Sequence, residues 1–145
     1  MAFQLPAIDK DSRRLRRDIE LAVGAFSRSH RYHSGTYLRD QIREVQDLAG
    51  RAWFDKENKA QLVDELVRAS DKLKRDLQLA KDVHAFRSFA QFEMLFRQAE
   101  NIGRQAGGMQ RQLKHPKGQN AEDRRVVPQR AQILSTGAAS RGANA

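Results

Sequence analysis

The sequence predicts an all-α protein: an antiparallel four-helix bundle followed by a flexible basic tail. Apolar residues recur every three or four positions in four successive segments of the chain, which is the spacing of one helix face. The chain also lacks the alternating apolar and polar runs that are typical of half-buried strands. Four helices with one apolar stripe each and short connections bury those stripes most simply in an antiparallel bundle.

The first predicted helix covers about residues 12–28. Asp11 and Ser12 offer capping side chains just before its apolar stripe, so residues 1–11 are expected to form an N-terminal arm. The stripe consists of Leu15, Ile19, Ala22, Val23 and Phe26. The second predicted helix covers about residues 36–53, and its stripe has the same spacing.

The segment HRYHSGTYLRDQI, residues 30–42, leaves three alternatives: a metal site, a catalytic loop or the start of the second helix. The chain contains no Glu-x-x-His pair of the kind found in di-metal bundles, no His-Glu-x-x-His zinc motif and no phosphate-binding glycine loop. A helix start is therefore favoured, in which Ser34 and Thr36 cap the helix. Gly35 then allows a sharp turn, and Tyr32 packs back over the first helical turn. We expect no catalytic, cofactor-binding or metal-binding residues.

The third predicted helix covers about residues 57–84 and carries a nearly heptad stripe of leucine and alanine. The fourth begins at Phe89 and ends before Pro116. Gly103 and Gly107 lie four residues apart on this helix, and each costs about 1 kcal/mol of helix propensity relative to alanine. Such a cost predicts that another helix approaches this face closely.

The positive charge is concentrated at the two ends of the chain. The formal net charge of +9 divides into +3 for residues 1–31, 0 for residues 32–102 and +6 for residues 103–145. Basic residues without acidic neighbours are available to a polyanion, and nucleic acid is the first candidate. The candidate nucleic-acid-binding residues are Arg13, Arg14, Arg16, Arg17, Arg31, Arg104, Arg111, Lys114, Lys117, Arg124 and Arg125.

Residues 115–145 lose the helical spacing and are rich in Gly, Ala, Ser, Asn and Gln. This composition predicts a flexible tail after a bundle that covers residues 12–114. The chain has no cysteine and no long apolar segment near Met1. We therefore expect a cytoplasmic protein without disulfides, signal peptide or membrane span.

Three stretches of the chain resemble one family of small helical proteins. They read HRYHSGTYLRDQIREVQDLAGRA, LVDELVRASDKLKRDLQLAKDVHAF and FEMLFRQAENIGRQAGG. With these stretches, residues 12–114 resemble the accessory variability determinant (Avd) proteins of diversity-generating retroelements, within the four-helix-bundle family that includes ribosomal RNA intervening-sequence proteins. None of the three stretches is a catalytic signature.

The resemblance implies a non-catalytic accessory protein that assembles into a basic homopentamer. It implies binding to the reverse transcriptase of the same retroelement and to structured template RNA and cDNA, in support of mutagenic copying. The alternative is a protein-interaction four-helix bundle that does not bind nucleic acid, similar to the ribosomal intervening-sequence proteins. An enzyme is the least favoured class, because the motifs of metal, phosphate and nucleophilic chemistry are missing from the sequence.

Overall fold

The computed structural model describes residues 6–115 of the chain. The N-terminal residues 1–5 and the predicted tail after His115 lie outside the described residues. The chain divides into one unit that ends at Gln110 and a second unit that begins at Arg111. Every regular element within residues 6–115 is helical, which confirms the all-α class.

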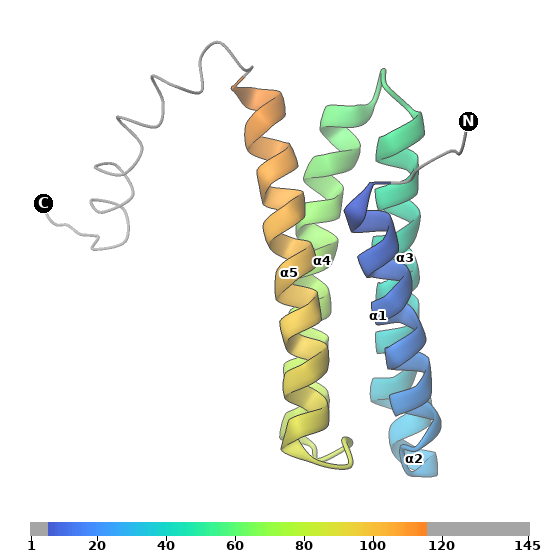
Figure 1. Ribbon diagram of the computed structural model, residues 1–145. Helices are drawn as coiled ribbons and strands as arrows, with labels where there is room; N and C mark the ends of the chain where they lie inside the picture. Colours follow the sequence, from blue (N-terminus) through green and yellow to red (C-terminus); the bar gives the residue numbers. More distant parts are fainter. Residues whose placement is uncertain (1–5, 116–145) are drawn as a thin grey trace, which may run out of the picture. The chain divides into compact units, whose positions relative to one another are not determined.

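Six consecutive elements make up the described chain. They are α1 (Ala7–Gly24), α2 (Arg28–His30), the π-helical segment η1 (Arg31–Gly35), α3 (Thr36–Phe54), α4 (Lys59–Asp82) and α5 (Phe89–Lys114). Because α2, η1 and α3 follow one another without a break, they form one continuous helix. In the unit that ends at Gln110, the helices α1, α3, α4 and α5 lie side by side (Figure 1).

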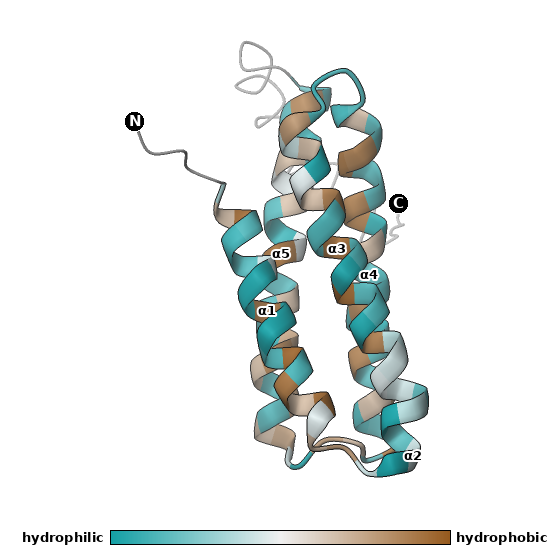
Figure 2. Ribbon diagram, turned by 90° about the vertical axis from the view of Figure 1, so that its right-hand side faces the viewer, coloured by the Kyte–Doolittle hydropathy of each residue, from teal (hydrophilic) through white to brown (hydrophobic). Residues whose placement is uncertain are grey.

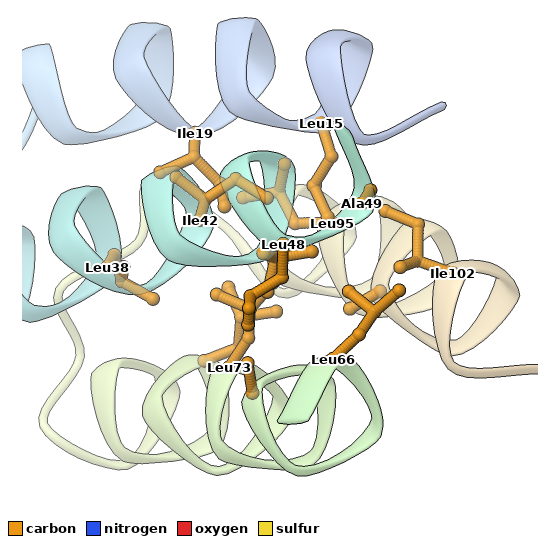
Figure 3. Close-up of a cluster of buried hydrophobic side chains, with 14 of the residues drawn as sticks. Leu15, Ile19, Leu38, Ile42, Leu48, Ala49, Leu66, Leu73, Leu95 and Ile102 are labelled. Atoms are coloured by element: carbon orange, nitrogen blue, oxygen red, sulfur yellow. The ribbon is translucent and has the colours of Figure 1, made fainter. Parts of the chain in front are cut away.

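One apolar core joins the long helices of this unit. Figure 3 shows side chains from α1, α3, α4 and α5 pointing toward one another, while polar residues cover much of the outer side of α1 (Figure 2). Burying one leucine or isoleucine side chain stabilises the fold by about 1.5–3 kcal/mol. Fully buried members of the core include Leu15, Ile19, Leu38, Ile42, Leu48, Leu66, Leu73, Leu77, Leu95 and Ile102. The three- and four-residue spacing in the sequence therefore identified the buried faces of α1, α3 and α4. On α5 the fully buried residues include Leu95 and Ile102, whereas Phe89, at which the fourth helix was predicted to begin, is 63% exposed.

Polar side chains connect α1 to α5 along the edge of the core. The Asp11 carboxylate accepts hydrogen bonds from Asn101 Nδ2 at 3.1 Å and from Gln105 Nε2 at 2.6 Å. Farther along α1, the Asp18 carboxylate accepts a hydrogen bond from Gln98 Nε2 at 2.9 Å. Hydrogen bonds to charged groups are the stronger ones, so these contacts hold the two helices in register.

The helix α1 begins earlier than the sequence predicts. Residues 7–11 belong to α1 rather than to an arm, and the predicted capping role of Asp11 and Ser12 is wrong. Pro6 precedes the first turn with φ −65° and needs no hydrogen-bond acceptor for its nitrogen. Ser12 is instead fully buried, and its Oγ donates to the Asp9 carbonyl at 3.0 Å. At its other end α1 stops at Gly24, four residues before the predicted boundary at 28.

The next helix also begins earlier than predicted, at Arg28 instead of residue 36. Its capping residue is Ser27, whose hydroxyl accepts a hydrogen bond from the His30 backbone N–H at 3.4 Å. The predicted capping by Ser34 and Thr36 is therefore wrong, because both lie inside the continuous helix. The predicted packing of Tyr32 over a first turn is wrong as well, since its side chain is 68% exposed.

Gly35 has helical backbone angles, φ −63° and ψ −41°, and does not form a turn. It is glycine for a steric reason. A Cβ at this position would lie 2.6 Å from Val23 Cγ1 and 3.3 Å from the His30 carbonyl oxygen. The absence of a side chain at Gly35 thus lets the end of α1 pack directly on η1.

The connection between α4 and α5 closes with a Schellman motif around His84. The Ala85 N–H donates to the Ala80 carbonyl at 2.9 Å, and the His84 N–H donates to the Lys81 carbonyl at 3.0 Å. His84 has φ 62°, the left-handed conformation that such motifs require and that glycine adopts most easily. Ala80 and Ala85 are both buried and supply the apolar contact that accompanies the motif.

A close approach between α4 and α5 occurs at Gly103. A Cβ on this glycine would lie 3.1 Å from Ser70 Oγ and 3.7 Å from Lys74 Nζ. This confirms the predicted close packing for Gly103, while the same prediction for Gly107 stays a prediction. Ser70 is 1% exposed, and its hydroxyl has no hydrogen-bond partner within the described residues.

Candidate nucleic-acid interface

Basic side chains gather on the face of α1 that points away from the core. Lys10, Arg13, Arg14 and Arg17 repeat at intervals of three, one and three residues, so they share one side of the helix. They line an open hollow of about 480 Å³ that has no acidic residue in its wall. We call this the α1 hollow.

Half of the cations in the α1 hollow have a carboxylate partner. Arg13 pairs with Asp9 at 3.0 Å, and Arg17 pairs with Asp18 at 3.1 Å. Lys10 and Arg14 form no ion pair with any residue in the described part of the chain. Both guanidinium groups are largely exposed, whereas the Asp9 and Asp18 carboxylates are largely buried. Lys10 and Arg14 are therefore the cations of the α1 hollow that are most available to a phosphate.

Arg16 points to a different side of α1. It is half-buried, and its guanidinium donates to Gln46 Oε1 of α3 at 3.0 Å. It lines a larger hollow of about 1140 Å³ between α1 and α3. The structure therefore separates Arg16 from Arg13, Arg14 and Arg17, with which the sequence had grouped it.

Charges of both signs line this larger hollow. Its acidic residues are Asp9, Asp47, Asp55 and Glu57, and its basic residues are Arg16, Arg43, Arg51 and Lys56. Hydrogen bonds from the Asn58 side chain and backbone lower the pKa of Asp55, which keeps that carboxylate ionised. A surface with equal numbers of acidic and basic residues attracts a polyanion only weakly, so we do not propose this hollow as a nucleic-acid-binding site.

A second hollow, whose charged lining residues are all arginines, lies on η1 and the helix turns beside it. It has a volume of about 630 Å³ and no acidic residue in its wall. We call it the η1 hollow. Its lining residues are Arg28, Arg31, Tyr32, Thr36 and Arg39.

The π-helical segment determines which side chains reach the η1 hollow. A π turn is wider than an α turn and shifts the following residues around the helix axis. Ser34 and Gly35 are buried as a result, whereas Thr36 lies on the exposed side with Arg31 and Tyr32. The Thr36 hydroxyl donates to the Tyr32 carbonyl at 3.0 Å, which gives this carbonyl oxygen of the π turn a side-chain hydrogen-bond donor. Such π segments occur frequently at functional sites.

Arg39 is held in place by a residue of α1. Its Nε donates to Glu20 Oε1 at 2.9 Å. Arg28 and Arg31 are exposed and form no ion pair with a residue between positions 6 and 115. The cluster therefore carries a net positive charge even with Glu20 counted.

The other predicted site residues lie outside these hollows. Arg104 is exposed on α5 and has no ion pair among the described residues, whereas its neighbour Arg97 pairs with Glu93 at 3.2 Å. Arg111 and Lys114 are exposed in the last turn of α5, in the unit that begins at Arg111. The predicted sites Lys117, Arg124 and Arg125 lie outside the described residues.

Three basic residues of the hollows were absent from the sequence-based site. Lys10 was missed because the first helix was expected to begin at residue 12, although the spacing from Lys10 to Arg17 was visible in the sequence. Arg28 was missed because the second helix was expected to begin at 36. Arg39 was missed because its partner Glu20 and the other cations of the hollow come from different parts of the chain, which only the folded structure brings together.

The described residues form neither a cluster of metal ligands nor a membrane-spanning helix. Residues 6–115 contain no group of three or more His, Asp or Glu side chains that could hold a metal ion. None of the helices described for this chain is long and apolar enough to cross a membrane. In comparisons with protein-family models, curated proteins and solved structures, the chain matches none.

Proposed function

We propose that this protein is a non-catalytic accessory factor of a diversity-generating retroelement, which binds template RNA and cDNA together with the reverse transcriptase. The observation that carries the nucleic-acid part is the pair of hollows lined by cations without an acidic residue. Arginine and lysine side chains displace counterions from a phosphate backbone and give affinity without reading sequence. The partner polymerase and the shape of the RNA then provide specificity.

The proposed assembly is an antiparallel four-helix bundle that forms a homopentamer in the cytoplasm. The resemblance of residues 12–114 to Avd proteins is the basis of the subunit number and of the polymerase partner. Self-association is supported by large apolar side chains on the surface, such as Leu21 at 69%, Phe89 at 63% and Met94 at 49% exposure. Exposed apolar surface of this kind is typical of protein–protein contacts.

The same apolar side chains favour one alternative function. A protein-interaction bundle would use them for a partner protein and would use its charge only for solubility. That alternative predicts no binding of nucleic acid at physiological salt. The two functions therefore differ in a single measurable property.

The proposal is tested with charge-removing substitutions on α1. The variant Lys10→Gln/Arg14→Gln loses two cations that have no ion pair among the described residues. We expect its affinity for structured RNA to fall and the slope of log affinity against log salt to become shallower by about one unit per lost phosphate contact. The matched control is Arg68→Gln/Arg75→Gln, which also removes two exposed cations, both on α4 and outside both hollows.

Circular dichroism is the control that checks whether both variants retain the helical fold. If the control and the α1 variant lose affinity equally, the α1 hollow is not a preferred phosphate site. If the unmodified protein does not bind RNA at all near physiological salt, the protein-interaction alternative is the better account.

A further inference from the structure

The η1 hollow differs from the α1 hollow in containing an aromatic ring. Tyr32 lines the η1 hollow together with three arginines, whereas the α1 hollow is lined by lysine and arginine alone. The Tyr32 side chain is 68% exposed. The Tyr32 ring does not contribute to the core, because the buried side of the same segment is formed by Ser34 and Gly35.

The arginines of the η1 hollow are suited to one phosphate group. The Arg39 Nε atom is already bound to Glu20 at 2.9 Å, which orients the guanidinium and leaves its terminal nitrogens without a hydrogen bond to any described residue. Arg28 and Arg31 lie three residues apart, so their side chains leave the same side of the helix. Planar guanidinium groups bind phosphate oxygens through two parallel hydrogen bonds.

The stretch of chain from Arg28 to Arg39 contains no acidic residue. The sequence between Glu20 and Asp40 contains no aspartate or glutamate. Among residues 6–115, the one ion pair of the lining residues joins Arg39 Nε to Glu20 of α1. A phosphate in the hollow therefore meets several cations without a facing carboxylate in the wall, while the Thr36 hydroxyl already donates to the Tyr32 carbonyl.

From this geometry we infer that the η1 hollow binds an unpaired nucleotide of RNA, with its phosphate on the arginines and its base stacked on Tyr32. The inference rests on the proposed function for the identity of the ligand. In a duplex, both faces of each internal base are covered by neighbouring bases, so Tyr32 has no face to stack on. Unpaired bases in loops and bulges are splayed out and stack on aromatic side chains. The η1 hollow thus gives the protein a preference for unpaired RNA, which the α1 hollow cannot provide.

The test compares two RNAs and three tyrosine variants of the full-length protein. The probes are a labelled single-stranded oligouridine and a blunt duplex RNA of equal length. Tyr32→Leu keeps an apolar side chain and removes the ring, while Tyr32→Phe keeps the ring and removes the hydroxyl. Tyr37→Leu is the matched control, because Tyr37 is 55% exposed on the neighbouring α3 and does not line the hollow.

We expect Tyr32→Leu to bind oligouridine about 5- to 150-fold more weakly, which is the effect of losing one base–aromatic stack. Tyr32→Phe and Tyr37→Leu should bind oligouridine as the unmodified protein does, and duplex binding should be unchanged in all three. Tyr32→Leu and Tyr37→Leu should show the same helical content by circular dichroism.

Two outcomes overturn the inference. If Tyr32→Leu binds oligouridine as well as the unmodified protein does, no base stacks on Tyr32. The proposed nucleic-acid binding is then still supported by the cations of the α1 hollow. If Tyr32→Leu weakens oligouridine and duplex binding equally, the ring has no preference for unpaired bases. Failure of the unmodified protein to bind either RNA is a separate result, which contradicts the proposed function itself.

Discussion

Replacing Gly35 with alanine tests the contact that holds η1 against α1. The added methyl group would lie 2.6 Å from Val23 Cγ1 and 3.3 Å from the His30 carbonyl oxygen. Val23 is fully buried, and a β-branched side chain in a helix has one strongly preferred rotamer. The side chain therefore cannot turn away, and α1 or η1 must shift to make room.

The magnitude follows from two opposing effects. Overpacking a buried site costs about 1–3 kcal/mol, and replacing a helical glycine with alanine gains about 1 kcal/mol of helix propensity. The matched control is Gly50→Ala in α3, where an added Cβ would meet nothing within 4 Å. The control should gain only the propensity effect. We therefore expect the two variants to differ by about 1–3 kcal/mol in free energy of unfolding, with Gly35→Ala the less stable.

The assay is equilibrium urea unfolding followed by circular dichroism. Urea slopes of about 1–3 kcal/mol per molar convert a difference of about 2 kcal/mol into a midpoint shift on the order of 1 M. Equal midpoints for Gly35→Ala and Gly50→Ala would refute the close-contact argument. A further check is Val23→Ala/Gly35→Ala, in which the shortened Val23 side chain should offset part of the cost of the added methyl group.

Three more predictions concern α4 and the end of that helix. His84→Gly should raise the free energy of unfolding by about 1 kcal/mol, because glycine adopts the φ of 62° without strain; an unchanged thermal midpoint would contradict this. Ser70→Ala should stabilise the fold by about 1 kcal/mol, because it removes a buried hydroxyl without a partner in the described chain; a less stable variant in urea would show that the hydroxyl is bonded. Burial raises the pKa of Asp76 above 3.8 in the folded state, so its contribution to stability is present at low pH and is lost as the pH rises through the raised pKa. Asp76→Asn should consequently be more stable than the unmodified protein at pH 7 but not at pH 3, and a constant difference across this range would argue against the effect.

The all-α class and the approximate position of most helices could be predicted from the spacing of apolar residues. Leu15, Ile19 and Val23 belong to the predicted stripe of the first helix and are fully buried. The bounds predicted for the third helix, 57–84, are close to the observed Lys59–Asp82, and Phe89 begins α5 as expected. Stripes of this kind are reliable because burial of one helix face dominates the stability of such a protein.

The start of the second long helix could not be predicted in the same way. Ser27 and Ser34 are both good capping residues by type, and local sequence does not decide between them. Gly35 lies close to Val23 of α1 in the folded chain, and a contact between two helices cannot be read from the local sequence. A π turn likewise has no strong local signature, so the burial of Ser34 could not be anticipated.

The candidate site was predicted in part. Arg13, Arg14 and Arg17 lie together in the α1 hollow as the sequence suggested, because they are close in sequence on one helix. Arg39 and Glu20 are 19 residues apart, and neighbours at such separations become visible only in the folded chain. The grouping of Arg28 with Arg31 and Tyr32 required the correct helix start.

The most direct test of the central claim is the affinity of the full-length protein for a labelled structured RNA across a salt series, measured beside a version that ends at His115. We expect log affinity to fall linearly and steeply with log salt, since counterions are released from the phosphate backbone. The fall should be shallower for the shortened version, because residues 116–145 include Lys117, Arg124 and Arg125. Absence of binding by both versions near physiological salt would contradict the claim that this protein binds nucleic acid.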